Sequence, residues 1–252
     1  MARSFNGSSD LINCGTSSIL NPNGGSASMT ASIWAYATSF PNAYNAVMGR
    51  SDGVNHYYVL QPKSTGKLAL YYIDNLGAGQ SYDGTGSNTL STGIWYHLAF
   101  TIGSGGGTSG ANGCQGFVNG AIDGGNSTAT GGITVITAST CLGSDNHGAN
   151  WAGRLADAAI WNVILTPIEI AALAKGIRPK SIRRTALLGY WPVDGLQSPE
   201  PDLSGNVNNG TLTGTSAAFG PPIVPFTPRW PRYELFTPPV PPQFVLMPQI
   251  VM

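Results

Sequence analysis

The stretch that decides the fold is IWYHLAFTI at residues 94–102, followed at residues 116–123 by GFVNGAID. The first stretch is rich in aromatic and β-branched residues, which favour strands. In the second, Asn119 and Gly120 stand between two short apolar runs. An Asn-Gly pair in that position predicts a type I′ hairpin, because both central residues of the turn need a positive φ. These residues therefore predict antiparallel strands joined by tight turns.

Similar strand patterns lie on both sides of this stretch, with no helical pattern between them. Regularly spaced short strands of this kind are typical of a β-sandwich or barrel. Between two of the strands, residues 103–113 consist largely of Gly, Ser, Thr and Asn, which predicts a flexible exposed loop. The other predicted strands cover residues 32–36, 57–60, 67–73, 133–136, 154–161 and 187–191.

One short helix is predicted after the strand at 154–161. Thr166, Pro167 and Glu169 form a capping box with proline at the first helical position. Gly176 predicts the end of this helix, because glycine readily adopts the left-handed conformation that follows a helix.

Prolines divide the chain into unequal parts. Of its 18 prolines, most follow residue 175, and proline cannot donate to a strand ladder. We expect a β-sandwich over residues 1–176, a basic linker with a returning strand that completes the sandwich over 177–219, and an extended arm over 220–252. The arm is too apolar for a solvated tail, so we expect it to lie either on its own sandwich or on a neighbour. In the second case it would anchor the protein in an assembly through Ile223, Phe226, Trp230, Tyr233, Phe236 and Phe244.

The charge balance of the chain limits the classes of binding partner that we expect. Twelve basic residues offset twelve acidic ones among 252 residues, so we expect neither nucleic acid nor an anionic membrane as the main partner. A surface poor in charge favours association, which predicts a homo-oligomer. No segment has the roughly 18 apolar residues of a membrane span, so no membrane insertion is expected.

The three cysteines are Cys14, Cys114 and Cys141. An odd number argues against a disulfide framework, and we expect buried, reduced thiols. A Cys114–Cys141 bridge stays open on the sequence.

Five motifs in order resemble the laminin-G-like group of concanavalin A-like lectins and glucanases. This resemblance implies an all-β jelly-roll sandwich, of the kind also found in phage structural proteins. A segment at residues 189–212 resembles the opening of such domains, although it comes last here. We favour its closing the sandwich within the chain over its donation to a neighbouring subunit. The five motifs are FNGSSDLI at 5–12, GIWYHLA at 93–99, FVNG at 117–120, CLGSD with WAGRLADAAIWN at 141–145 and 151–162, and the capped helix at 166–176.

Catalysis is not expected. Glucanases of this group use paired carboxylates that flank the glycosidic bond, but the three glutamates are Glu169 in the helix cap and Glu200 and Glu234 in the proline-rich region. The histidines His56, His97 and His147 are isolated from one another and show no triad pattern. We therefore expect a protein that is not an enzyme and has no catalytic residues.

Two kinds of ligand are considered. Calcium-binding loops use Asp and carbonyl oxygens, which makes Asp52 and Asp145 weak candidates for a structural calcium; otherwise no cofactor is expected. Aspartates in turns more often cap their own backbone. The candidates for glycan contacts are the aromatic and loop residues Tyr44, Tyr57, Asp145, Asn146, His147 and Trp151.

Two functions follow from these patterns. The first is a structural subunit of a virion, such as a phage capsid decoration or head-fibre protein, with capsid protein as a partner and a place on the virion surface after assembly in the host cytoplasm. The first residues lack the pattern of a secretory signal, which favours cytoplasmic synthesis or a sequence that begins after processing. The alternative is an extracellular or cell-surface lectin-like module that binds glycans.

Overall fold

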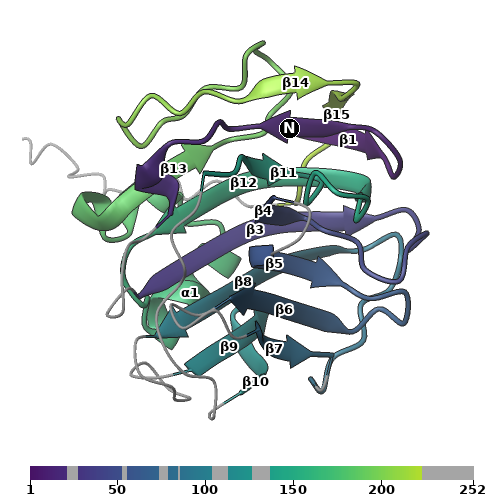
Figure 1. Ribbon diagram of the computed structural model, residues 1–252, viewed down its shortest axis with the longest axis vertical. Helices are drawn as coiled ribbons and strands as arrows, with labels where there is room; N and C mark the ends of the chain where they lie inside the picture. Colours follow the sequence, from purple (N-terminus) through teal and green to yellow (C-terminus); the bar gives the residue numbers. More distant parts are fainter. Residues whose placement is uncertain are drawn as a thin grey trace, which may run out of the picture.

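The computed structural model describes residues 1–21, 28–52, 56–73, 79–84, 86–103, 113–126 and 137–222. These residues form two antiparallel sheets packed face to face, with one α-helix, and so confirm the all-β jelly-roll sandwich (Figure 1). The predicted strand at 133–136, residues 104–112 of the predicted loop and residues 223–252 of the predicted arm lie outside the described residues.

Sheet A has eight strands within the described part of the chain. Its β12 carries a bulge between Ala156 and Ala159, which separates its two halves. On one side, β1 pairs with the first half and β13 with the second half. In spatial order, sheet A contains β10 (Ala121–Asn126), β9 (Gly113–Val118), β8 (Trp95–Gly103), β3 (Met29–Ala37), β12 (Ala152–Trp161), β1 (Ala2–Asn6) and β15 (Ser216–Ala218), with β13 (Leu187–Trp191) beside β12.

Sheet B has seven strands within the same described ranges. In spatial order they are β14 (Thr211–Thr213), β2 (Leu11–Asn13), β11 (Thr140–Leu142), β4 (Met48–Ser51), β5 (His56–Pro62), β6 (Leu68–Ile73) and β7 (Gly79–Asp83).

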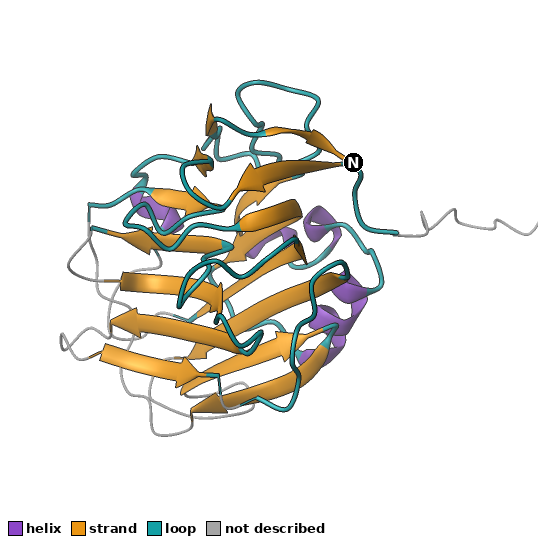
Figure 2. Ribbon diagram, turned by 90° about the vertical axis from the view of Figure 1, so that its right-hand side faces the viewer, coloured by secondary structure: helices purple, strands orange, loops and turns teal. Residues whose placement is uncertain are grey.

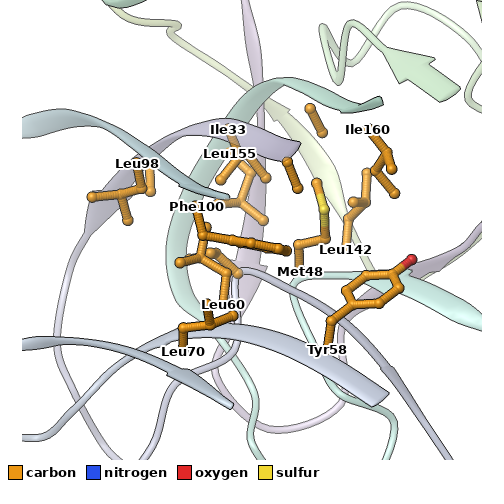
Figure 3. Packing of buried hydrophobic residues seen from close by; sticks show 14 of the residues in the cluster. Ile33, Met48, Tyr58, Leu60, Leu70, Leu98, Phe100, Leu142, Leu155 and Ile160 are labelled. Atoms are coloured by element: carbon orange, nitrogen blue, oxygen red, sulfur yellow. The ribbon is translucent and has the colours of Figure 1, made fainter. Parts of the chain in front are cut away.

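The main core fills the space between the two sheets. Alternate residues of a strand point to opposite faces, so every second residue of the central strands enters this layer. Figure 3 shows Ile33, Leu98, Phe100, Leu155 and Ile160 from sheet A packed near Met48, Tyr58, Leu60, Leu70 and Leu142 from sheet B.

A second apolar layer covers the outer face of sheet A. The helix α1 (Pro167–Ala174) and short 3₁₀ turns lie on that side (Figure 2). Ile170 and Leu173 of α1 pack with Trp161 and Phe117 of the sheet. This part of sheet A is therefore buried on both faces. No helix in the described ranges has the length and apolar character needed to cross a membrane.

The predicted hairpin turn and the predicted helix cap are both confirmed. Asn119 and Gly120 both have positive φ values, 51° and 82°, in the turn between β9 and β10. The helix begins after Thr166, whose hydroxyl accepts from the Glu169 N–H while the Glu169 carboxylate accepts from the Thr166 N–H. Its last residue is Ala174, two before Gly176.

The segment after the helix returns to the sandwich within the chain. β13 pairs with β12, β14 with β2, and β15 with β1. Two arginines of the basic linker pair with carboxylates within the chain: Arg178 with Asp157 at 2.8 Å and Arg183 with Glu169 at 2.5 Å. In Figure 1 the first strand and the two last strands lie together at one end of the molecule.

The structure corrects the predicted environment of Glu200 and decides the state of the three cysteines. Glu200, expected in the proline-rich region, is instead fully buried and paired with Arg3, because the returning segment folds against β1. Cys14, Cys114 and Cys141 are all buried free thiols, so the open Cys114–Cys141 bridge is not formed.

Candidate functional site

A groove lies on the outer face of sheet B, on the side away from the core. Its floor is made of residues that alternate with core residues on β5, β6 and β7. Gln61 pairs with Ala69, and Ala69 pairs with Asp83. Tyr71 pairs with Ser81 in the next row. The cavity has a volume of about 580 Å³, within the range of small-ligand sites.

An aromatic wall closes one side of this groove. Tyr44 is 37% exposed and comes from the loop before β4. Its hydroxyl donates to Asp83 Oδ1 at 3.3 Å, and Lys63 Nζ lies 5.3 Å from the centre of its ring. Lys63 Nζ also lies 3.0 Å from Asp83 Oδ2, and this hydrogen bond raises the pKa of Lys63. The ring of Tyr44 is thus held in position while part of it stays open to solvent.

The loop after β11 forms the opposite wall. Asp145 is buried, and its Oδ1 accepts from the N–H groups of His147 and Ala149 at 2.8 and 3.0 Å. Ser144 Oγ accepts from the Asn146 N–H and donates to Asn150 Oδ1, both at 2.8 Å. These bonds give the loop a defined shape before any ligand arrives.

The loop is also tied to its surroundings. Asn150 Nδ2 donates to the Ser8 carbonyl at 2.8 Å, and Asn42 Nδ2 donates to the Asn150 carbonyl at 3.2 Å. His147 is exposed, and its Nε2 lies 3.3 Å from the Ser51 carbonyl. The wall is therefore anchored to three other parts of the sandwich.

The structure brings together only some of the residues expected to contact glycans. Asp145, His147 and Tyr44 line the groove. Asn146 is exposed on the same loop, with a φ of 68°. Trp151 and Tyr57 lie in the core cluster, 1% and 4% exposed, so neither ring presents a face to solvent.

Both calcium candidates, Asp52 and Asp145, use their carboxylates in hydrogen bonds to nearby groups. Asp52 Oδ2 accepts from the Tyr57 hydroxyl at 2.9 Å, and Asp145 caps its own loop. Within the described residues, no group of three or more metal-ligating side chains occurs. Nothing in this arrangement adds to the sequence argument for calcium.

Sequence reasoning missed the floor of the groove. Gln61, Tyr71, Ser81 and Asp83 all belong to strands whose alternate residues are in the core. A period-of-two pattern could have placed Tyr71 opposite the core-facing Leu70 and Tyr72. It could not have shown that β5, β6 and β7 are neighbours.

The chain belongs to the concanavalin A-like lectin/glucanases superfamily, whose family model matches residues 6–171. Five motifs in order had indicated this group from the sequence, and the match confirms it. No curated protein matches the chain in sequence.

Solved structures with the same fold include two with a TM-score above 0.5. A proposed carbohydrate-binding protein from Bacteroides ovatus has a TM-score of 0.60 and 19% identity over 88% of this chain, which spans only 61% of that protein. Domain 4 of an extracellular arabinanase from Geobacillus stearothermophilus, solved with arabinotriose, has a TM-score of 0.52 and 23% identity. That match covers 69% of this chain and 76% of the domain. At these identities the likeness establishes the fold.

Proposed function

We propose that this protein is a non-catalytic carbohydrate-binding module, and that the groove on sheet B is its binding site. The observation that carries the proposal is the groove itself, in which a partly exposed Tyr44 ring stands beside the polar groups of Gln61, Asp83 and His147. Sugars present both an apolar ring face and many hydroxyl groups. Sites that combine a few aromatic side chains with directed polar groups suit such ligands.

The proposed absence of catalysis rests on where the carboxylates lie. Glu169 is used in the helix cap and by Arg183, and Glu200 is buried against Arg3. In the groove, Asp83 is paired with Lys63 and Asp145 caps its own loop. Each of these four carboxylates is engaged by a partner within the protein, whereas glycoside hydrolysis needs two carboxyl groups free to flank the glycosidic bond.

The structural relatives support the glycan-binding alternative of the sequence analysis. Arabinotriose, bound by the arabinanase domain, is a reasonable first probe. By the same support we propose an extracellular or cell-surface location. The virion role stays a prediction, because the arm on which it depends lies outside the described residues.

The experiment is calorimetric titration of the full chain with neutral oligosaccharides, starting with arabinotriose and followed by a glycan array. Tyr44→Ala and Gln61→Ala should each weaken binding of any neutral sugar at least tenfold. Ile122→Ala is the matched control, because Ile122 is an exposed apolar residue on β10 of the other sheet. Equal affinity in Tyr44→Ala and the wild type, or no sugar bound on the array, would refute the proposal.

A further inference from the structure

The outer face of sheet A carries a row of side chains in register across five strands. Trp95 of β8 pairs with Tyr36 of β3, Tyr36 with Arg154 of β12, Arg154 with Ser4 of β1, and Ser4 with Ser216 of β15. Their strand neighbours Ala35 and Leu155 point into the core, so these five side chains face outward. We call these five residues the arginine row, after Arg154 at its centre. With about 4.8 Å between neighbouring strands, the row is about 19 Å long.

The guanidinium of Arg154 is held against an aromatic ring. Its Cζ lies 4.8 Å from the centre of the Tyr36 ring. On the other side of Tyr36, the ring of Trp95 lies 5.6 Å away at an angle of 51°. A cation–π contact of this kind uses no N–H donor in a hydrogen bond to a carboxylate, so the donors of Arg154 stay available to a ligand.

Arg154 differs from the arginines that stabilise the fold. Arg3, Arg178 and Arg183 each pair with a carboxylate. Within the described part of the chain, the Arg154 side chain has neither an ion pair nor a hydrogen bond, only the contact with Tyr36. A cation that is partly buried on an aromatic surface without a counter-ion is suited to an anionic ligand.

The row ends in a shallow pocket of about 410 Å³, on the side of β1 and β15. Arg154, Ser4 and Ser216 line it together with Phe219, which is 82% exposed. Among the described residues that line it, none carries a carboxylate. The pocket thus combines a positive charge, two hydroxyl groups and an apolar ring.

We infer that the arginine row is a second binding site, separate from the groove on sheet B, for an acidic saccharide. Its carboxylate would receive two hydrogen bonds from the edge of Arg154, a geometry that guanidinium groups favour. The sugar rings would lie along Trp95 and Tyr36, and Ser4 and Ser216 would bond hydroxyl groups. A length of about 19 Å suits a short oligosaccharide rather than a single sugar. The site goes beyond the proposed function, which concerns neutral sugars on the opposite face.

The test is a titration of the full chain with oligomers of galacturonate, alginate and hyaluronan. At least one should bind, and its methyl ester, which lacks the charge, should bind at least tenfold more weakly. Arg154→Gln should reduce affinity for the acid at least tenfold, and Trp95→Ala several-fold. Arg154→Lys should fall between wild type and Arg154→Gln, because lysine keeps the charge but not the paired hydrogen bonds. Unchanged melting temperatures would show that the variants fold.

Two controls separate this site from the groove. Lys63→Gln removes a positive charge beside the groove and should leave binding of the acid unchanged. Tyr44→Ala should weaken the binding of neutral sugars without affecting the binding of acidic ones. The proposal for the groove and the inference for the arginine row can therefore be refuted independently. The inference is wrong if none of the three acids binds, if Arg154→Gln binds as well as wild type, or if a synthetic peptide of residues 223–252 binds at Arg154 while the acids do not.

Discussion

Arg3 and Glu200 form a buried ion pair, with Nε 2.6 Å from Oε2, that ties the first strand to the segment after β13. The other carboxylate oxygen accepts from the Val193 N–H at 2.7 Å, and the Arg3 guanidinium also donates to the Gln197 carbonyl. Both side chains are withdrawn from solvent, 5% and 0% exposed. The pair therefore joins residues that are almost 200 positions apart in the chain.

Removing one partner of this pair should be costly. Glu200→Gln keeps an acceptor for Val193 but leaves the Arg3 charge buried without a counter-ion, which typically costs about 3–5 kcal/mol. Urea denaturation measures the loss. Arg3→Met combined with Glu200→Gln removes both charges and should recover much of it. A loss below about 1 kcal/mol in Glu200→Gln would mean that Arg3 finds solvent or another partner.

His97 should make the fold sensitive to acid. Burial lowers its pKa from 6.5 to about 3, and the ring packs edge-on against Trp34 at 5.4 Å. Between those two values the unfolded chain binds a proton that the folded chain does not. Stability should therefore fall as pH is lowered from about 6.5 towards 3, by up to about 1.4 kcal/mol per pH unit from this residue.

The measurement for His97 is the free energy of unfolding across that range in the wild type and in His97→Leu. The variant lacks the titrating group, so its acid slope should be shallower. Parallel curves for the two proteins would show that His97 is hydrated or charged in the folded state.

The cysteines should not react in the folded protein. Burial raises the pKa of Cys114 to about 11 and of Cys141 to about 12, and also raises the pKa of Cys14. The thiolate is the reactive form. Ellman's reagent at pH 8 should thus find no thiol in the native protein and three in guanidinium chloride. Finding one thiol after denaturation would reveal a disulfide bridge.

The helix cap should contribute a small, separable amount of stability. Thr166→Ala removes the hydroxyl that accepts from the Glu169 N–H, at a typical cost of about 1 kcal/mol. Thr166→Ser keeps the oxygen and is the matched control. Thermal or urea unfolding compares the three proteins. Equal losses in both variants would point to the methyl group of Thr166 rather than to the cap.

Local chemistry explains which predictions the sequence could support. The turn at Asn119-Gly120 and the cap at Thr166 each depend on residues within four positions of one another, and both are present. For Trp151 and Tyr57, two candidates for glycan contacts, the sequence could not show whether the ring is buried or exposed. An aromatic residue in a strand pattern fits either position. Both face the core.

The sequence by itself determined the family, the alternating strands, the hairpin and the capped helix, because these depend on residue types at short spacings. Only the tertiary structure decided the partner of Glu200, the neighbours in the groove and the row from Trp95 to Ser216. Each of these depends on which strands lie side by side and in which register. Pairing between distant strands follows from the packing of the whole core, and a pattern within one strand does not contain it.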